Sequence, residues 1–433
     1  MQRVGATALV PLAACVLFAG YGLSSADQAL PANTGEARLG VERVAVLGSA
    51  YLWSLIVCLR NRSIWMRLLR RQWPYLILLA YILASASWSF LPRKVLIDWG
   101  HFVGHALVAS AATFHLLHHP RRIAVVVAMS CAVIIAASIP VSITMPSLGT
   151  DLMTGRWQGV TGNSNTLGLI SLLSLWACLS GWYLYPELRM RVMYLGIATI
   201  TVAALVGSRS MTSIGASAFL LLSLPVFQRL ASASVSARRW MISGLFFATV
   251  FALLTLLAFV PELLRPETAA SNLGRDATLT GRQELWAFAI EKILEKPVTG
   301  WGFDSLASAL AGTDFAYGQM HNGYLDLLVR GGAIGLALAL VIVLRALYLA
   351  ATQLRSRHRL GAPLLALMLA IVLHNITEAS LFRAASVYSL MLVLSYTFLE
   401  LYATAPAVLR SRTENASRRT RPAHPATLPN LLR

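Results

Sequence analysis

The sequence predicts an all-α, polytopic integral membrane protein with about twelve transmembrane helices and one large loop on the outer side of the membrane. Composition indicates this class: 57% of the 433 residues are hydrophobic and only 12% are charged. Soluble domains carry about 25% charged residues and lack repeated apolar stretches of about 20 residues. The alternating segments of about ten residues that are typical of an outer-membrane barrel are absent from the sequence.

The apolar runs define the predicted transmembrane segments. They cover residues 4–23, 43–59, 74–91, 98–117, 123–143, 165–185, 192–207, 210–228, 240–260, 331–352, 362–380 and 385–403. The chain therefore divides into nine helices over 1–260, a large outer loop at 261–330, three helices over 331–403 and a basic tail at 404–433. We expect the polar tail to be disordered. The stretch LAAC (12–15) resembles a lipoprotein cleavage site, but the apolar run continues beyond it, which favours a retained first helix.

The arginines predict the orientation. The formal net charge is +18, with 36 Lys and Arg against 18 Asp and Glu. Such a balance also occurs in nucleic-acid-binding proteins, but Lys and Arg accumulate in the cytoplasmic loops of membrane proteins. With the N-terminus in the cytoplasm and alternating spans, the cytoplasmic segments hold 22 of these residues and the longer outer segments hold 13. We expect both termini to be cytoplasmic.

The loop at 261–330 is much longer than a simple connection between two helices, which indicates structure or function of its own. It contains nine of the eighteen carboxylates of the chain. Within it, QELWAFAIEKILEK (283–296) has helical periodicity, and Pro297 and Gly300 end the pattern. We expect a short amphipathic helix that lies on the bilayer surface or over a cavity.

Four polar stretches fall on the same predicted outer side. They are SRSMTS (208–213), GRDATLTGR (274–282), MHNGYLDLLVRGGAIG (320–335) and HNITEAS (374–380). Arg209 lies where two spans meet, and an arginine there either snorkels to the interface or faces a partner or a water-filled cavity. Guanidinium groups bind diphosphate well because they donate paired hydrogen bonds and keep their charge. Arg209 and Arg282 therefore predict a site for a lipid-linked phosphate or diphosphate.

Several other residues are candidates for this site. The imidazole of His321 has a pKa range that suits a general base, although a structural histidine at a helix start is an alternative. His374 and Glu378 lie near the outer end of the 362–380 segment, where we expect His374 to pack and Glu378 to reach the outer cavity. The amides of Asn163 and Asn165 suit a helix cap, with ligand contact as the alternative. We assign no metal, because HLLHH (115–119) falls in a basic segment predicted to be cytoplasmic.

Taken in order, these segments resemble the O-antigen ligase and O-antigen polymerase superfamily of bacterial membrane glycosyltransferases, which includes exopolysaccharide polymerases. The matching pieces are GNSNTLG, SRSMTS, TGRQELW, EKPVTGWGF and MHNGYLDLLVRGGAIG. They cover residues 200–340 well, and the helix layout, which is like that of GT-C glycosyltransferases, extends the likeness over most of the chain.

The resemblance implies a metal-independent, inverting transfer of a glycan from undecaprenyl diphosphate to a sugar hydroxyl at the periplasmic face of the inner membrane, without a cofactor. It implies that Arg209 and Arg282 hold the donor diphosphate and that His321 contacts or deprotonates the acceptor. To these catalytic candidates we add Arg275 as a further diphosphate ligand. Asn322, Tyr324, His374 and Glu378 are expected to support them. Two fixed cations can stabilise a diphosphate leaving group without a metal.

The acceptor distinguishes two enzymes of this superfamily. A ligase transfers the glycan to lipid A-core of lipopolysaccharide, whereas a polymerase transfers it to another lipid-linked repeat unit; the phrase GRDATLTGRQELW favours the polymerase. A lipid-linked glycan transporter is a further alternative, but such carriers usually place ionisable groups near the bilayer midplane. An assembly factor without catalysis would not explain arginines at separate outer span ends. None of these readings involves nucleic acid.

Overall fold

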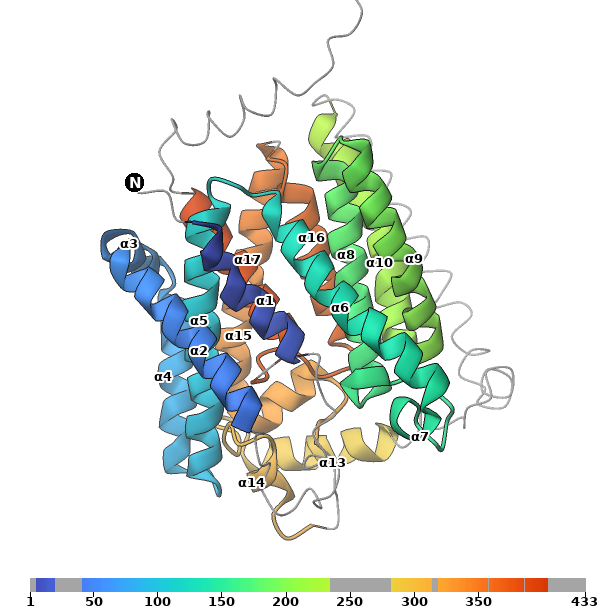
Figure 1. The fold of residues 1–433 in the computed structure, drawn as a ribbon. Coiled ribbons are helices and arrows are strands. Elements are labelled where there is room, and N and C mark those ends of the chain that lie inside the picture. The colour runs from blue at the N-terminus through green and yellow to red at the C-terminus, as the bar shows by residue number, and fades with distance from the viewer. Residues whose placement is uncertain are drawn as a thin grey trace, which may run out of the picture.

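The computed structural model describes residues 5–19, 41–233, 282–313, 318–356, 358–384 and 386–403. These residues form helices and connecting turns, with no β-strand among them (Figure 1). The helices are α1 (Val10–Ala19), α2 (Val41–Arg60), α3 (Arg62–Arg71), α4 (Trp73–Ala84), α5 (Pro92–Leu116), α6 (Arg122–Thr144), α7 (Pro146–Gly149), α8 (Ser164–Leu184), α9 (Leu188–Ser208), α10 (Met211–Ser232), α13 (Arg282–Glu295), α14 (Ala307–Leu310), α15 (Gly323–Arg355), α16 (Gly361–His374) and α17 (Val387–Ala403). The all-α class is therefore confirmed.

Every predicted transmembrane segment within the described residues overlaps one of these helices, and the segment 240–260 lies outside them. Six helices in the described part (α5, α6, α8, α9, α10 and α15) are long and apolar enough to cross a membrane, and the bent pair α2–α3 raises the number to seven. Four further apolar helices are shorter. The chain is a multi-pass membrane protein, and the total of twelve spans stays a prediction.

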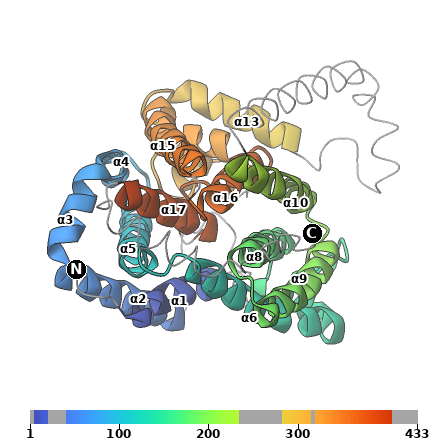
Figure 2. The ribbon, with the colours of Figure 1, turned by 90° about the horizontal axis from the view of Figure 1, so that it is seen from above.

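Helices α8 and α17 form the centre of the bundle. Figure 2 shows α8 between α6, α9, α10 and α16, and α17 beside α5 and α15. Nearly all of α17 is buried, and so is most of α8. The ring nitrogen Nε1 of Trp176, a fully buried residue of α8, donates to the carbonyl of Pro363 at 2.8 Å. This bond fixes α8 against the start of α16.

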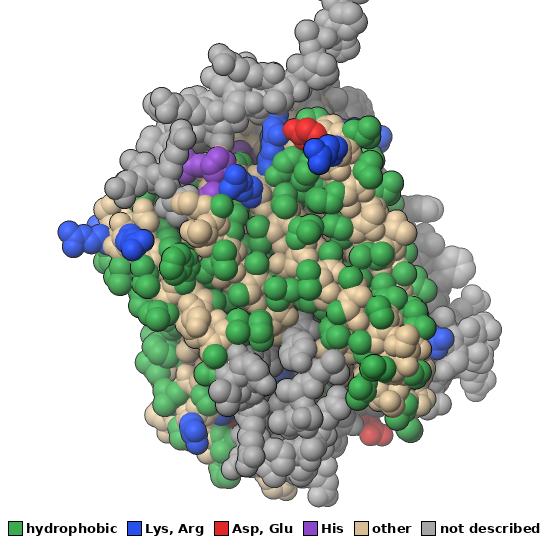
Figure 3. Space-filling view, in the orientation of Figure 1, with side chains coloured by type: hydrophobic (Ala, Val, Ile, Leu, Met, Phe, Trp, Pro, Cys, Tyr) green, Lys and Arg blue, Asp and Glu red, His purple; other side chains and the backbone are tan. Residues whose placement is uncertain are grey.

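The outer faces of the bundle carry apolar side chains that water would not tolerate over such an area. Leu52, Leu222 and Leu344 are each at least 60% exposed, and each lies on a different helix. In Figure 3, hydrophobic side chains cover the middle of the visible face, and charged side chains lie near its two ends. This distribution is that of a helical bundle embedded in lipid.

Helix α13 confirms the helix predicted over 283–296, and it lies across one end of the bundle in Figure 1. Leu285 and Ala289 are buried, whereas Ile290 and Leu294 are exposed. The buried side packs on α15 and on α14. The helix therefore covers the end of the bundle on one side and presents apolar side chains on the other.

Helix α15 is broken at Gly332, where φ is 57° and ψ is −163°. Around this break the backbone of α15 forms hydrogen bonds with the segment after α13 in place of hydrogen bonds within the helix. The carbonyls of Val329 and Arg330 accept from Trp301 and Gly302, each at 2.9 Å. The N–H groups of Ala333 and Ile334, which would serve those carbonyls in a regular helix, instead donate to the carbonyls of residues 297 and 298. All eight groups keep partners, and the loop is joined to the membrane helix.

Substitution of Gly332 by alanine is expected to destabilise the protein by roughly 1–3 kcal/mol or more. The backbone conformation at Gly332 is one that essentially only glycine adopts, and an added Cβ would lie 2.3 Å from the carbonyl oxygen of Val298. Thermal unfolding in detergent measures the loss. Gly335→Ala is the matched control, because a Cβ at Gly335 would meet Phe303 and Tyr81 at ordinary distances of 3.4 and 3.5 Å. Equal midpoints for the two variants would contradict the prediction.

Candidate active site

The carboxylate of Glu378 is the point where three distant segments of the chain meet. Its Oε1 accepts from Arg282 Nη2 and from Asn165 Nδ2, each at 3.0 Å. Its Oε2 lies 3.1 Å from Nδ1 of His321. The side chain of Glu378 is 6% exposed, against 20% for Arg282 and 27% for His321. The carboxylate thus lies beneath a guanidinium and an imidazole that both reach solvent.

Glu378 lies in a turn, which corrects the predicted helix over 362–380. Helix α16 ends at His374, because the Oδ1 of Asn375 accepts the backbone N–H groups of Ser380 at 2.9 Å and Leu381 at 2.8 Å. Asparagine side chains compete with helical hydrogen bonding in this way. The carboxylate is therefore aimed by a closed loop and not by a further turn of helix.

Arg282 is the first residue of α13, and two kinds of contact hold this helix in place: apolar packing and a hydrogen bond. Leu285 and Ala289 anchor it in a buried apolar cluster that also contains Met320. The indole Nε1 of Trp286 donates to the carbonyl of Met320 at 3.0 Å. Since Met320 directly precedes His321, this bond fixes the start of α13 relative to the imidazole.

His321 lies in the turn that leads into α15. The next residue, Asn322, caps the helix: its Oδ1 accepts the N–H groups of Tyr324 at 3.0 Å and Leu325 at 3.1 Å. The hydroxyl of Tyr324 donates to the carbonyl of Val372 on α16 at 2.9 Å. Asn322 and Tyr324, which were predicted as supporting residues, thus hold the backbone around His321.

The turn carrying His321 is pressed against the turn carrying Glu378. The backbone N–H of Gly323 donates to the carbonyl of Asn375 at 2.8 Å. A Cβ at Gly323 would lie 2.2 Å from the side-chain oxygen of Asn375, so only glycine permits this approach. The glycine of MHNG therefore allows His321 and Glu378 to meet.

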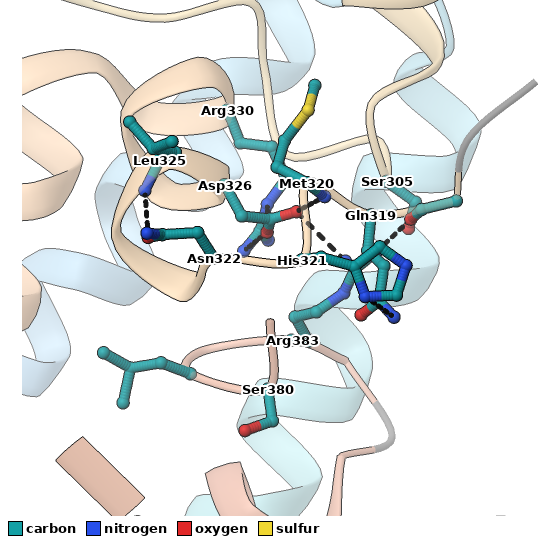
Figure 4. Close-up of polar contacts among 12 residues, drawn as sticks. Ser305, Gln319, Met320, His321, Asn322, Leu325, Asp326, Arg330, Ser380 and Arg383 are labelled. Carbon is teal, nitrogen blue, oxygen red and sulfur yellow. Dashed lines mark hydrogen bonds and ion pairs between the residues drawn. The ribbon is translucent and has the colours of Figure 1, made fainter. Parts of the chain in front are cut away.

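A buried ion cluster beneath this turn holds residues 318–320 in place (Figure 4). The carboxylate of Asp326, 1% exposed, pairs with Arg330 at 2.7 Å and with Arg383 at 3.0 Å. The same carboxylate accepts the N–H of Met320 at 3.3 Å, and Arg383 also donates to the carbonyl of Gly318 at 2.6 Å. The loop before His321 is thus held at Gly318 and Met320 by the charged groups of this cluster, and breaking the cluster would leave a charge buried without its partner.

The contact with Glu378 defines the proton arrangement on the His321 ring. An ionised carboxylate can only accept hydrogen bonds, so the bond to Glu378 requires a proton on Nδ1. In a neutral imidazole this leaves Nε2 as the proton acceptor. A carboxylate behind a histidine favours this tautomer and stabilises the imidazolium that forms when Nε2 takes a proton.

The pKa of Glu378 is lowered from its ordinary value. Burial is the largest single influence and acts to raise the pKa, because it disfavours the charged form. The hydrogen bond and charge of His321, the charge of Arg282 and the charge of His374 together outweigh it. Glu378 is therefore ionised at neutral pH.

Arg209 ends α9 on the same side of the bundle. It is exposed, and its turn is joined to the turn of Glu378 by two side-chain contacts. Thr212 and Thr377 share a hydrogen bond of 2.7 Å between their hydroxyls, and the hydroxyl of Ser213 lies 3.4 Å from Nε2 of His374. His374 is buried against Tyr388, in agreement with the predicted packing position. These contacts join the first turn of α10, which follows Arg209 directly, to the end of α16 and the turn of Glu378.

Both Arg209 and His321 have left-handed backbone, with φ of 46° at each. Positive φ occurs at only five non-glycine residues in the described part of the chain. Such strain persists where the surroundings impose it and is concentrated at functional sites.

Arg275 lies outside the described residues. Within the described ranges, no three His, Cys, Asp or Glu side chains gather as metal ligands would.

Asn163 and Asn165 were predicted to cap a helix, with ligand contact as the alternative. Asn163 does cap α8, with its Oδ1 accepting from the N–H groups of Asn165 and Thr166. Asn165 instead points to Glu378, and Arg156 stands behind it. Their common position on the predicted outer side, in the motif RWQGVTGNSN, was the available signal.

The fold and this site define a class: a multi-pass helical membrane protein that gathers arginines, a histidine and a carboxylate at one end of its bundle. Residues 194–340 match the family described as O-antigen ligase, which confirms the superfamily resemblance carried by the motifs. The match includes Arg209, Arg282 and His321, and it supports a membrane glycosyltransferase of the O-antigen ligase or polymerase type. No curated protein matches the chain.

Proposed function

We propose that this protein is a metal-independent, inverting glycosyltransferase that moves a glycan from undecaprenyl diphosphate to a sugar hydroxyl during polysaccharide polymerisation. One observation carries the proposal: Arg282 and His321, from segments 39 positions apart, contact the two oxygens of the same buried carboxylate. A cation for the leaving group and a base for the acceptor are needed within reach of one glycosidic carbon. The family match over residues 194–340 supports the same reaction class.

In this reaction the diphosphate is the leaving group. The bond between the anomeric carbon and the diphosphate oxygen breaks, and its electron pair stays on the diphosphate. Arg282, with Arg209 and Arg275 as further ligands, stabilises the charge that develops there. Arg282 is 20% exposed and paired with Glu378, so it can exchange this carboxylate for the stronger charge of the incoming diphosphate.

The acceptor hydroxyl attacks from the opposite face of the sugar ring, which inverts the anomeric centre. His321 accepts the hydroxyl proton on Nε2, and Glu378 keeps the Nδ1 proton in place and balances the positive ring. His321 is 27% exposed, so an acceptor can reach it from the outer side.

The site lies at the periplasmic face of the bacterial inner membrane in this proposal. The orientation rests on the excess of Lys and Arg in the segments assigned to the cytoplasm. At that face the partners are a lipid-linked glycan donor and either a lipid-linked repeat unit or lipid A-core. We favour the repeat unit, which makes the protein an O-antigen or exopolysaccharide polymerase; ligation to lipid A-core is the second candidate, supported by the description of the matched family.

The test supplies purified protein with a lipid-linked glycan and either repeat units or lipid A-core as acceptor. We expect a ladder of longer lipid-linked glycans with the first acceptor, and the same yield with a chelator present. A mass increase of lipid A-core alone would identify a ligase. No transfer to either acceptor, with transport of the lipid-linked glycan across proteoliposomes, would replace the proposal by a carrier.

A further inference from the structure

Arg156 joins two parts of the site that are far apart in the sequence. Its Nε donates to the carbonyl of Ser208 at 3.0 Å, and its Nη2 donates to Oδ1 of Asn165 at 2.6 Å. Ser208 directly precedes Arg209 at the end of α9, whereas Asn165 lies in the first turn of α8. One guanidinium thus connects the turn of Arg209 to the residue that contacts Glu378.

The contact with Arg156 also determines which way the Asn165 amide faces. Arginine only donates hydrogen bonds, so the amide atom beside it must be the oxygen. The amide nitrogen is then directed at Glu378, whose ionised Oε1 only accepts, at 3.0 Å. Both contacts agree with one orientation, and the opposite orientation would place donors against donors and acceptors against acceptors.

We propose that Arg156 and Asn165 are positioning residues of this active site: Arg156 fixes the amide of Asn165, and Asn165 holds the Glu378 carboxylate in line with His321. The inference rests on the proposed function and extends it to two residues outside the segment of the family match. It also explains how Arg282 can leave Glu378 for a diphosphate. Oε1 of Glu378 accepts from both Arg282 and Asn165, so the hydrogen bond from Asn165 remains when Arg282 moves away.

The groups that face Glu378 come from four elements. They are Arg282 on α13, His321 in the turn before α15, His374 at the end of α16, and Asn165 on α8 with Arg156 behind it. Asn165 is the neutral donor in this set. Its hydrogen bond favours the ionised carboxylate, so its loss moves the pKa of Glu378 upward. A protonated Glu378 no longer balances a positive His321.

The experiment compares Asn165→Ala and Asn165→Leu with Asn163→Ala. Asn165→Leu keeps about the size of the side chain and adds no charge, but it neither accepts from Arg156 nor donates to Glu378. Asn163 is two residues away on the same helix end and caps it without touching Glu378. Asn163→Ala therefore loosens this helix end, including the backbone N–H of Asn165, while it leaves the Asn165 amide that contacts Glu378 intact.

Two readouts are measured on each purified full-length variant. The first is the pH titration of the Glu378 carboxyl band by infrared difference spectroscopy, with Glu378→Gln to identify the band. The second is the pH profile of glycan transfer. We expect both Asn165 variants to protonate Glu378 at higher pH than wild type and to shift the acid limb of transfer in the same direction. Asn163→Ala should lower the melting temperature and leave both curves in place.

Each outcome has a separate meaning. An unchanged carboxyl titration in Asn165→Leu, or an equal shift in Asn163→Ala, overturns the positioning role even if wild-type protein transfers glycan. A shifted titration in a protein that transfers nothing supports the positioning role and refutes the proposed function. Arg156→Gln should give a smaller shift than Asn165→Ala, because it frees the amide without removing it; a wild-type titration in Arg156→Gln would remove Arg156 from the proposal.

Discussion

Replacing Arg282 with alanine is expected to lower the rate of glycan transfer by roughly 100- to 1,000-fold, the usual cost of removing one donor that stabilises charge in a transition state. Arg282 contacts the Glu378 carboxylate at 3.0 Å and in our proposal exchanges it for the diphosphate. The variant leaves a buried carboxylate with Asn165 and His321 as partners, so the fold should persist. Transfer from a lipid-linked donor by purified protein is the measurement.

Arg93→Ala is the matched control for this prediction. Arg93 is an exposed arginine in the first turn of α5, on the same predicted side of the membrane. Its removal lowers the outer charge by the same amount without touching the Glu378 cluster, so transfer should stay near the wild-type rate. Normal transfer by Arg282→Ala, or equal losses in both variants, would show that general charge and not the site arginine is needed.

The second large effect concerns stability. Replacing Asp326 with alanine is expected to destabilise the protein by about 3–5 kcal/mol, because it leaves a buried arginine without its counter-charge. The side chain of Arg330 is only 4% exposed, and Arg383 shares the same carboxylate. Met320 loses its backbone anchor as well, so the turn carrying His321 should loosen. Thermal unfolding in detergent and limited proteolysis near residue 320 would record both changes.

A double variant separates the lost charge from the lost volume. Asp326→Leu with Arg330→Met replaces the most buried pair by apolar side chains, and such replacements are often neutral or stabilising. Arg383, whose side chain is 18% exposed, loses its partner in both variants. We expect the double variant to recover part of the melting temperature lost in Asp326→Ala. If Asp326→Ala melts at the wild-type temperature, the ion cluster does not hold this turn, and the placement of His321 must have another cause.

The helices could be predicted from the sequence because their signals are local. Apolar runs marked the spans, and the periodicity of residues 283–296 with the following Pro297 gave α13 within a residue of its observed ends. The end of α16 could not be predicted in this way. The apolar run passes into the polar stretch HNITEAS (374–380) without a proline or glycine to mark the last helical residue, and the side chain of Asn375 ends the helix by a contact made only in the folded turn.

The candidate site was predictable in part for the same reason. Arg282 and His321 could be selected because polar residues beside apolar spans are rare and costly. Their meeting on Glu378 depends on tertiary contacts, such as those of Trp286 with Met320 and of Gly323 with Asn375, and the spacing of residues in the sequence does not predict these contacts. Asn165 shows the limit most clearly, since a cap and a site residue look identical in GNSN until the fold places one of them against a carboxylate.

The carboxylate of Glu378 has a consequence for selectivity. It acts as an intramolecular competitor, because any anion that binds Arg282 must displace the Glu378 carboxylate, whose effective concentration is set by the fold. Inorganic phosphate offers little beyond its charge in return. A lipid-linked diphosphate brings two charged groups, a glycan and a polyprenyl tail in the bilayer, so it can displace Glu378 where a free anion cannot, and the site discriminates against small anions without a lid.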